Sequence, residues 1–276
     1  MVFRNLRAIV QSMYNFHVGL PGIIPNLLNT MLETGFLAQL SDVSFLSRKI
    51  WQEKFRKLIN ETNKRTFKGE HYWQSSAEEV DALSVHGGFS ISIPDLMGKA
   101  EHCFEKARPL PYAETRIENV CQILSGKPIT FHLTIMSQYD YLVFAAKQLS
   151  VDLKLSQIHT VPSWSDLAQR LRVASGGAQV VVWDFEQPKK VILTFLIDFL
   201  NVHDEDDITK LANYLSKSTN QNDFAGSNSP TMAVEGQDLS IIMDEQYEID
   251  LEAIRQIEGV KLYTPENISR EYFLRR

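Results

Sequence analysis

Continuous runs of apolar residues alternate along the chain with segments whose apolar residues recur every three or four positions. The clearest runs are Tyr14–Gly19, Ile129–Ile135 and Gln179–Phe185, which are typical of strands buried on both faces of a parallel sheet. Further strand candidates are Leu83–Phe89 and the possible edge strand Gly259–Tyr263. Helical spacing predicts helices in Asn26–Leu40, Ser44–Ile59, Arg116–Leu124, Tyr139–Leu149, Ser163–Ala174, Val191–Phe199 and Glu248–Ile257.

This alternation predicts an α/β fold, a doubly wound and mostly parallel sheet flanked by helices, in a single domain over residues 1–276. The segment Ser216–Gln237 is rich in Ser, Asn, Gln and Gly, so we expect a mobile polar segment at about 216–238. The acidic run Asp204–Asp207 fits a solvated helix start better than a metal site, and no metal site is predicted.

Composition narrows the class of protein. A net charge of −6 over 276 residues, without a basic patch, argues against nucleic-acid binding. No apolar run reaches the ~18 residues of a membrane span, and no signal-peptide pattern is present, so we expect a cytoplasmic protein. Cys103 and Cys121 are too few for a zinc site or a disulfide framework.

Four segments, taken in chain order, resemble bacterial sulfotransferases. They are Phe16–Pro21 (FHVGLP), Ser125–Tyr141 (SGKPITFHLTIMSQYDY), Pro162–Leu167 with Val181–Glu186 (PSWSDL and VVWDFE), and Tyr247–Leu262. The resemblance spans roughly residues 14 to 265. It implies a P-loop-type domain, whose active members transfer a sulfuryl group from 3′-phosphoadenosine 5′-phosphosulfate (PAPS) to a hydroxyl or amine.

When the donor-binding residues of the family are mapped onto this sequence, other residue types stand at their positions. The lysine of the phosphate loop falls on Gly22, the 3′-phosphate arginine falls on Met136, and the family's serine falls on Phe144. Ile23, Ile24, Pro25 and Asn26 stand in place of Thr-Gly-Thr-Thr, and Pro25 lacks an N–H donor. The degenerate loop would consist of Gly19, Leu20, Pro21, Gly22, Ile23, Ile24 and Asn26, with Ser137 as a further candidate contact.

We therefore interpret the chain as a catalytically degenerate relative that binds a protein or glycan partner or acts as a scaffold. The oligomeric state stays open, and we expect no cofactor. An active PAPS-dependent sulfotransferase, acting on a carbohydrate or small molecule, is one alternative, and His86 is then the candidate base. A structural subunit of a larger assembly is another. His17 and His132 lie inside apolar strands and are expected to be core residues.

Overall fold

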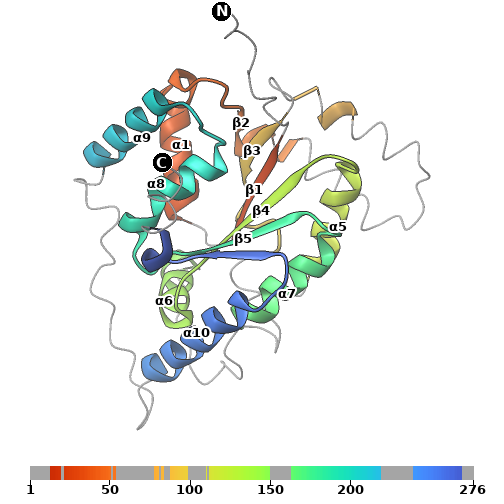
Figure 1. The fold of residues 1–276 in the computed structure, drawn as a ribbon, viewed down its shortest axis with the longest axis vertical. Coiled ribbons are helices and arrows are strands. Elements are labelled where there is room, and N and C mark those ends of the chain that lie inside the picture. The colour runs from red at the N-terminus through yellow and green to blue at the C-terminus, as the bar shows by residue number, and fades with distance from the viewer. Residues whose placement is uncertain are drawn as a thin grey trace, which may run out of the picture.

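Six parallel strands lie side by side in the order β2-β3-β1-β4-β5-β6 (Figure 1). The computed structural model describes residues 13–19, 22–50, 52–53, 78–80, 82–83, 88–98, 110, 112–149, 163–218 and 239–268. The strands are β1 (Tyr14–Gly19), β2 (Phe45–Leu46), β3 (Phe89–Ser92), β4 (Ile129–Ile135), β5 (Gln179–Asp184) and β6 (Val260–Tyr263). This sheet confirms the predicted α/β class and places the three clearest predicted strands next to one another.

Helices cover both faces of the sheet. Figure 1 shows α1 (Ile23–Glu33), α8 (Pro188–Phe199) and α9 (Glu205–Ser218) on one side. On the other side α7 (Trp164–Ala174) packs against both α5 (Ala113–Ile123) and α10 (Leu239–Arg255), and α10 also contacts α6 (Gln138–Leu149). Two further short helical elements are η1 (Leu37–Gln39) and α2 (Arg48–Ile50). None of the helices in the described ranges combines the length and apolar character that crossing a membrane requires.

The central strands are buried because a strand covered by helices on both sides has no solvent-facing residues. All seven residues of β4 are buried, and Phe16 of β1 packs against the ring of Phe131 with the ring centroids 5.6 Å apart. The register sets His17 beside both Ser92 of β3 and His132 of β4. Trp183 of β5 stacks on Tyr263 of the edge strand β6.

Two predicted elements are wrong in place or type. The predicted helix Ser44–Ile59 starts as a strand, since Phe45–Leu46 forms β2 and pairs with β3. The predicted strand Leu83–Phe89 overlaps the real strand only at Phe89, where β3 begins. Gly88 lies directly before β3, and a Cβ on this residue would lie 2.2 Å from the Met13 carbonyl oxygen. This glycine therefore allows β3 to approach the chain entering β1.

Other elements have the predicted type, but their observed bounds differ from the predicted ones. Helix α1 begins at Ile23 and ends at Glu33, and α10 begins at Leu239, well before the predicted Glu248. Residues Ser216–Ser218 complete α9, and the rest of the predicted mobile segment lies outside the described residues. The acidic run Asp204–Asp207 does start a helix, because Asp204 accepts hydrogen bonds from the N–H groups of Asp206 and Asp207.

Strand order fixes where a ligand crevice belongs. From β1 the chain passes to β2 and β3 on one side of β1, and from β3 it crosses to β4 on the other side. Open α/β sheets bind ligands outside the carboxyl ends of their strands, near such a reversal. Gly19, Ile135, Asp184 and Tyr263 end their strands at this edge of the sheet.

Candidate functional site: an acidic pocket at the carboxyl edge

The predicted phosphate loop has the expected frame of strand, glycine turn and helix. Gly19 ends β1 with φ of 111°, and Gly22 precedes α1 with φ of 104°. A Cβ on Gly19 would lie 2.5 Å from the carbonyl oxygen of Thr134 in β4. The glycine is thus required for the approach of β1 to β4, which explains it without a phosphate. Leu20 and Pro21 lie outside the described residues.

Few backbone donors remain at the start of α1. The Asn26 N–H donates to the Gly22 carbonyl oxygen, so it belongs to the helix and is not available to a ligand. Pro25 has no N–H. Only Ile23 and Ile24 keep first-turn N–H groups without a helical acceptor. Helix α1 also has no side-chain cap and no basic residue in this turn.

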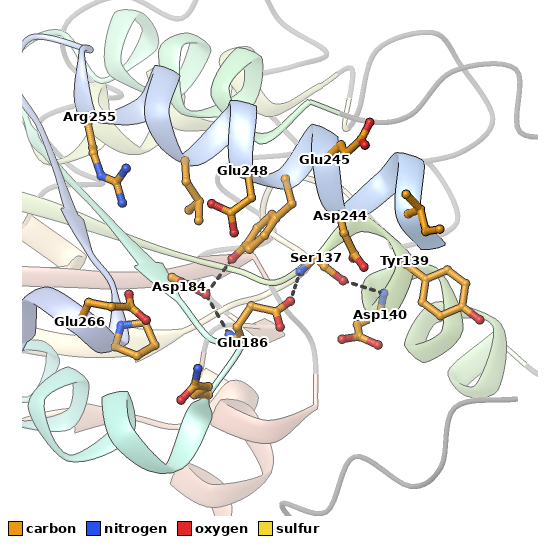
Figure 2. Close-up of a pocket in the computed structure, with 15 residues that line it drawn as sticks. Ser137, Tyr139, Asp140, Asp184, Glu186, Asp244, Glu245, Glu248, Arg255 and Glu266 are labelled. Atoms are coloured by element: carbon orange, nitrogen blue, oxygen red, sulfur yellow. Dashed lines mark hydrogen bonds between the residues drawn. The ribbon is translucent and has the colours of Figure 1, made fainter. Parts of the chain in front are cut away.

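A pocket of about 980 Å³ lies at the carboxyl edge, beyond β4, β5 and β6, and is roofed by α10 (Figure 2). Its lining includes none of the described residues of the glycine loop, and of the predicted site only Ser137 takes part. Among the described residues, seven carboxyl groups and a single guanidinium, that of Arg255, line it. The acidic residues are Asp140, Asp184, Glu186, Asp244, Glu245, Glu248 and Glu266.

Asp184 forms the buried end of this site. It is the last residue of β5, and only 4% of its surface is exposed. Its Oδ1 accepts hydrogen bonds from the Tyr247 hydroxyl at 2.7 Å and from the Glu186 N–H at 2.9 Å. Burial raises the pKa of the Asp184 carboxyl above its usual range, and the nearby Glu266 and Glu248 raise it further, against these two hydrogen bonds. The pKa of Tyr247 is raised well above its ordinary value, mainly by burial, so Tyr247 is an O–H donor.

Glu186 and Ser137 connect the ends of β5 and β4. The Ser137 N–H donates to Glu186 Oε1 at 2.8 Å, and the Ser137 hydroxyl accepts from the Asp140 N–H at the start of α6. Partial burial raises the pKa of Glu186, and Asp140, Asp184 and Asp244 raise it further, although the residue as a whole is open to solvent. Both polar groups of Ser137 are therefore engaged within the protein, one of them with a carboxylate.

A second carboxylate, Asp250, holds α10 in place over the pocket. It is fully buried and accepts hydrogen bonds from the Ser163 and Ser165 hydroxyls, the Trp164 N–H and the Gln138 side chain. Ser163 caps α7, since its hydroxyl accepts from the Asp166 N–H. Asp250 thus joins α10 to the first turns of α6 and α7, where helix dipoles favour a negative charge.

The two strand histidines are core residues, as predicted. His17 lies between the Ser92 and Thr134 hydroxyls, 2.8 and 3.0 Å from its ring nitrogens. His132 Nδ1 accepts from the Trp183 indole N–H at 3.2 Å. Burial lowers the pKa of each histidine to about 3, and His132 lowers that of His17 further. His132 is therefore neutral at ordinary pH, and its 3.9 Å approach to Asp198 is not an ion pair.

Of His86 and the two cysteines, the structure describes only Cys121. His86, the candidate base, lies outside the described residues, as does Cys103. Burial, and then Glu118, raise the pKa of the Cys121 thiol to about 11, so it is not a reactive thiolate. Within the described ranges, no group of three or more His, Cys, Asp or Glu is arranged to hold a metal ion.

Sequence reasoning missed the acidic pocket because its carboxylates come from distant parts of the chain. A signal was present in Asp184 and Glu186, since acidic residues at the end of a buried parallel strand lie at the ligand edge of the sheet. Comparison with protein-family models, with curated proteins and with solved structures found no match for this chain. The pocket's own chemistry is therefore the basis for a functional proposal.

Proposed function

We propose that this chain is a binding protein, not a nucleotide-dependent transferase, and that its ligand is a cation that enters the acidic pocket. The observation that carries the proposal is that the described residues of the lining include seven carboxyl groups and one arginine. Electrostatic complementarity selects a partner of opposite charge and repels one of like charge. PAPS carries about four negative charges, so this edge of the sheet disfavours it.

The glycine loop supports the same proposal. The resemblance to sulfotransferases places the donor phosphates at Gly19–Asn26, where α1 offers two N–H groups and no side-chain cation. A helix N-terminus contributes at most about 2 kcal/mol to anion binding, which does not replace a lysine and an arginine. This geometry agrees with a sulfotransferase relative that keeps the fold and has lost the donor contacts. The resemblance itself stays a proposal.

Two calorimetric titrations test the proposed function. Titration with 3′-phosphoadenosine 5′-phosphate, the product that an active enzyme must bind, is expected to give no heat of binding. Titration with hexalysine, a general probe for a cation site, is expected to show binding that weakens as salt is added. Micromolar affinity for the nucleotide would support the active sulfotransferase and overturn the proposal.

A matched pair of variants locates the binding. Asp184→Asn removes one charge inside the pocket, whereas Glu118→Gln removes one on the exposed surface of α5. Hexalysine affinity should fall for Asp184→Asn and stay unchanged for Glu118→Gln. Equal losses in both variants would indicate nonspecific attraction to an acidic protein and would contradict the proposal.

A further inference from the structure

One face of the central strands is polar although it is buried. Alternate residues of β1, β3 and β4 point to the same side of the sheet, because side chains alternate along a strand and these strands are in register. On this face they are Asn15, His17, Ser90, Ser92, His132 and Thr134, all of them buried. Strands that helices cover on both sides are usually apolar on both faces. This face therefore differs from an ordinary strand core, and its contacts with the covering helix define its role.

Helix α8 covers this polar face (Figure 1). The Phe199 carbonyl oxygen, at the end of α8, accepts hydrogen bonds from the Asn15 amide and the Ser90 hydroxyl. The rings of Phe195 and Phe199 lie edge-on to both strand histidines, with ring centroids 5.4 to 6.2 Å apart. Helix α8 thus lies directly over the two imidazole rings and shields them from water.

A chain of hydrogen bonds links His132 to α8. The Trp183 indole N–H can only donate, so His132 Nδ1, 3.2 Å away, carries no proton. The proton of the neutral ring is then on Nε2, which faces the Asn15 amide oxygen at 3.5 Å. The Asn15 amide nitrogen donates in turn to the Phe199 carbonyl oxygen at 2.9 Å. The chain runs from β5 through β4 and β1 to α8, and it is complete only while His132 is neutral.

The covered site is unfavourable for protonated histidine. A proton on His132 Nδ1 would face the Trp183 N–H, donor against donor, and a proton on His17 would add a like charge on the adjacent strand. Among the described residues that bond to, stack on or approach the two rings, Asp198 of α8 is the charged one, 3.9 Å from His132 Nδ1. Its side chain is 46% exposed, so solvent screens its attraction for a protonated ring. Burial accordingly lowers the pKa of both histidines to about 3.

We propose that acid releases α8 from the sheet, because His17 and His132 take up protons when α8 moves away and water reaches their rings. The fold then contains a pH-sensitive cover, whose opening exposes the polar face of β1, β3 and β4. With α8 displaced, each imidazole recovers an ordinary pKa near 6.5. Between pH 7.5 and 5.0, protonation favours the open state about 30-fold for each histidine that reaches water. This inference does not rest on the proposed cation binding.

Native-state hydrogen exchange at pH 7.5 and 5.0, followed by mass spectrometry and corrected for the intrinsic pH dependence of exchange, tests the inference. We expect the opening equilibrium of the α8 amides to rise at least about 30-fold at pH 5.0. Their exchange should depend little on low concentrations of urea, since local opening exposes less surface than global unfolding. The amides of α7, on the other face of the sheet, should stay better protected and should lose protection as urea is added.

Single variants assign the effect to the histidines. His132→Gln and His17→Gln should each show a smaller acid effect on α8 than the wild type, by up to about 30-fold, because each removes one protonation site. The two variants are separate tests, so the misfolding of one leaves the other. His203→Gln, at an exposed position before α9, is the matched control and should keep the full effect.

Three results would overturn the inference. If α8 and α7 show the same protection and the same urea dependence at pH 5.0, acid acts through global unfolding alone. If both histidine variants keep the full acid effect, the protons bind elsewhere. If α8 is better protected at pH 5.0 than at pH 7.5, and Asp198→Asn removes that gain, protonated His132 pairs with Asp198 and holds the helix in place.

Discussion

Alanine substitutions at Gly19 and Gly176 would separate the free-energy cost of steric crowding from that of backbone strain. Both have positive φ, 111° and 60°, but a Cβ on Gly19 would meet the Thr134 backbone, whereas nothing lies within 4 Å of one on Gly176. We expect Gly176→Ala to cost about 1 kcal/mol of unfolding free energy, from strain alone. Gly19→Ala should cost at least about 3 kcal/mol, because β1 and β4 must also separate. Urea unfolding of both variants measures the difference, and equal losses would mean that Gly19 is not held by this contact.

The charge of Asp184, which the proposed cation binding uses, is expected to lower the stability of the fold. The pKa of Asp184 is raised in the folded protein, so the folded state binds the proton more tightly than the unfolded state. The stability that this group contributes is therefore lost as pH rises through its folded pKa. Asparagine is neutral throughout and keeps an oxygen for the Tyr247 and Glu186 donors. Asp184→Asn should therefore raise the unfolding free energy at pH 7 by about 0.5–2 kcal/mol.

The pH dependence of that gain provides the check. Chemical unfolding at pH 7 and at pH 4.5 should show the advantage of Asp184→Asn shrinking as the wild-type carboxyl takes up its proton. Glu118→Gln, on exposed α5, should show no comparable gain. A variant that is less stable at pH 7 would indicate that the ionised Asp184 contributes to the fold.

Among the elements, α10 is attached through the buried carboxylate of Asp250 in addition to its buried apolar residues. Asp250→Asn places an amide where Ser163, Ser165, Trp164 and Gln138 all donate, so donors would face donors. We expect a loss of about 3 kcal/mol of unfolding free energy, typical of a charged acceptor with several donors. Glu252→Gln, on the exposed side of the same helix, should leave stability unchanged. Thermal unfolding compares the two, and an unaffected Asp250→Asn would show that α10 is held by its apolar contacts alone.

Element prediction from sequence succeeded where burial and periodicity agreed. The bounds of β4 were predicted to the residue because ITFHLTI is a continuous run of β-branched, aromatic and other strand-forming residues, as is typical of a buried parallel strand. Strand β2 was missed because Phe45 and Leu46, followed by Ile50, also fit a helical period, and only pairing with β3 decides between them. The start of α10 was missed because Ile241 and Ile242 are exposed, which weakens the amphipathic pattern.

The candidate site was harder to predict than the fold. The glycine loop could be recognised as a strand-turn-helix, but its glycines serve chain packing, as at Gly19 against Thr134. The pocket depends on β5, α6, α10 and residues 265–266 meeting at one edge, and sequence order alone does not reveal that meeting. Asp184 could have been noticed at the end of its buried strand, whereas Asp244 and Glu248 look like ordinary solvated helix residues.

At the scale of the whole molecule, the buried histidines predict how the protein responds to acid. His17 and His132 have pKa values of about 3 in the folded state against 6.5 in the unfolded state. Below pH 6.5 the unfolded chain therefore binds protons that the folded chain does not, and stability falls as pH falls toward 3. Each histidine contributes a slope of about 1.4 kcal/mol per pH unit in that window. Asp184 and Glu186, with raised pKa values, act in the opposite direction, so the total slope is smaller than the sum for the histidines.

A single substitution isolates the histidine contribution from that of the carboxylates. His132→Gln should be less stable than the wild type at pH 7.5, because the Trp183 N–H and the surrounding rings lose a fitted partner. Its stability should nevertheless depend less on pH, by about 1.4 kcal/mol per unit between roughly pH 6 and 4. His203→Gln, at an exposed position before α9, should leave the slope as it is. Urea unfolding at several pH values yields these slopes. An unchanged slope in His132→Gln would mean that His132 takes up protons in the folded protein almost as readily as in the unfolded chain, with the ring reaching solvent or pairing with Asp198.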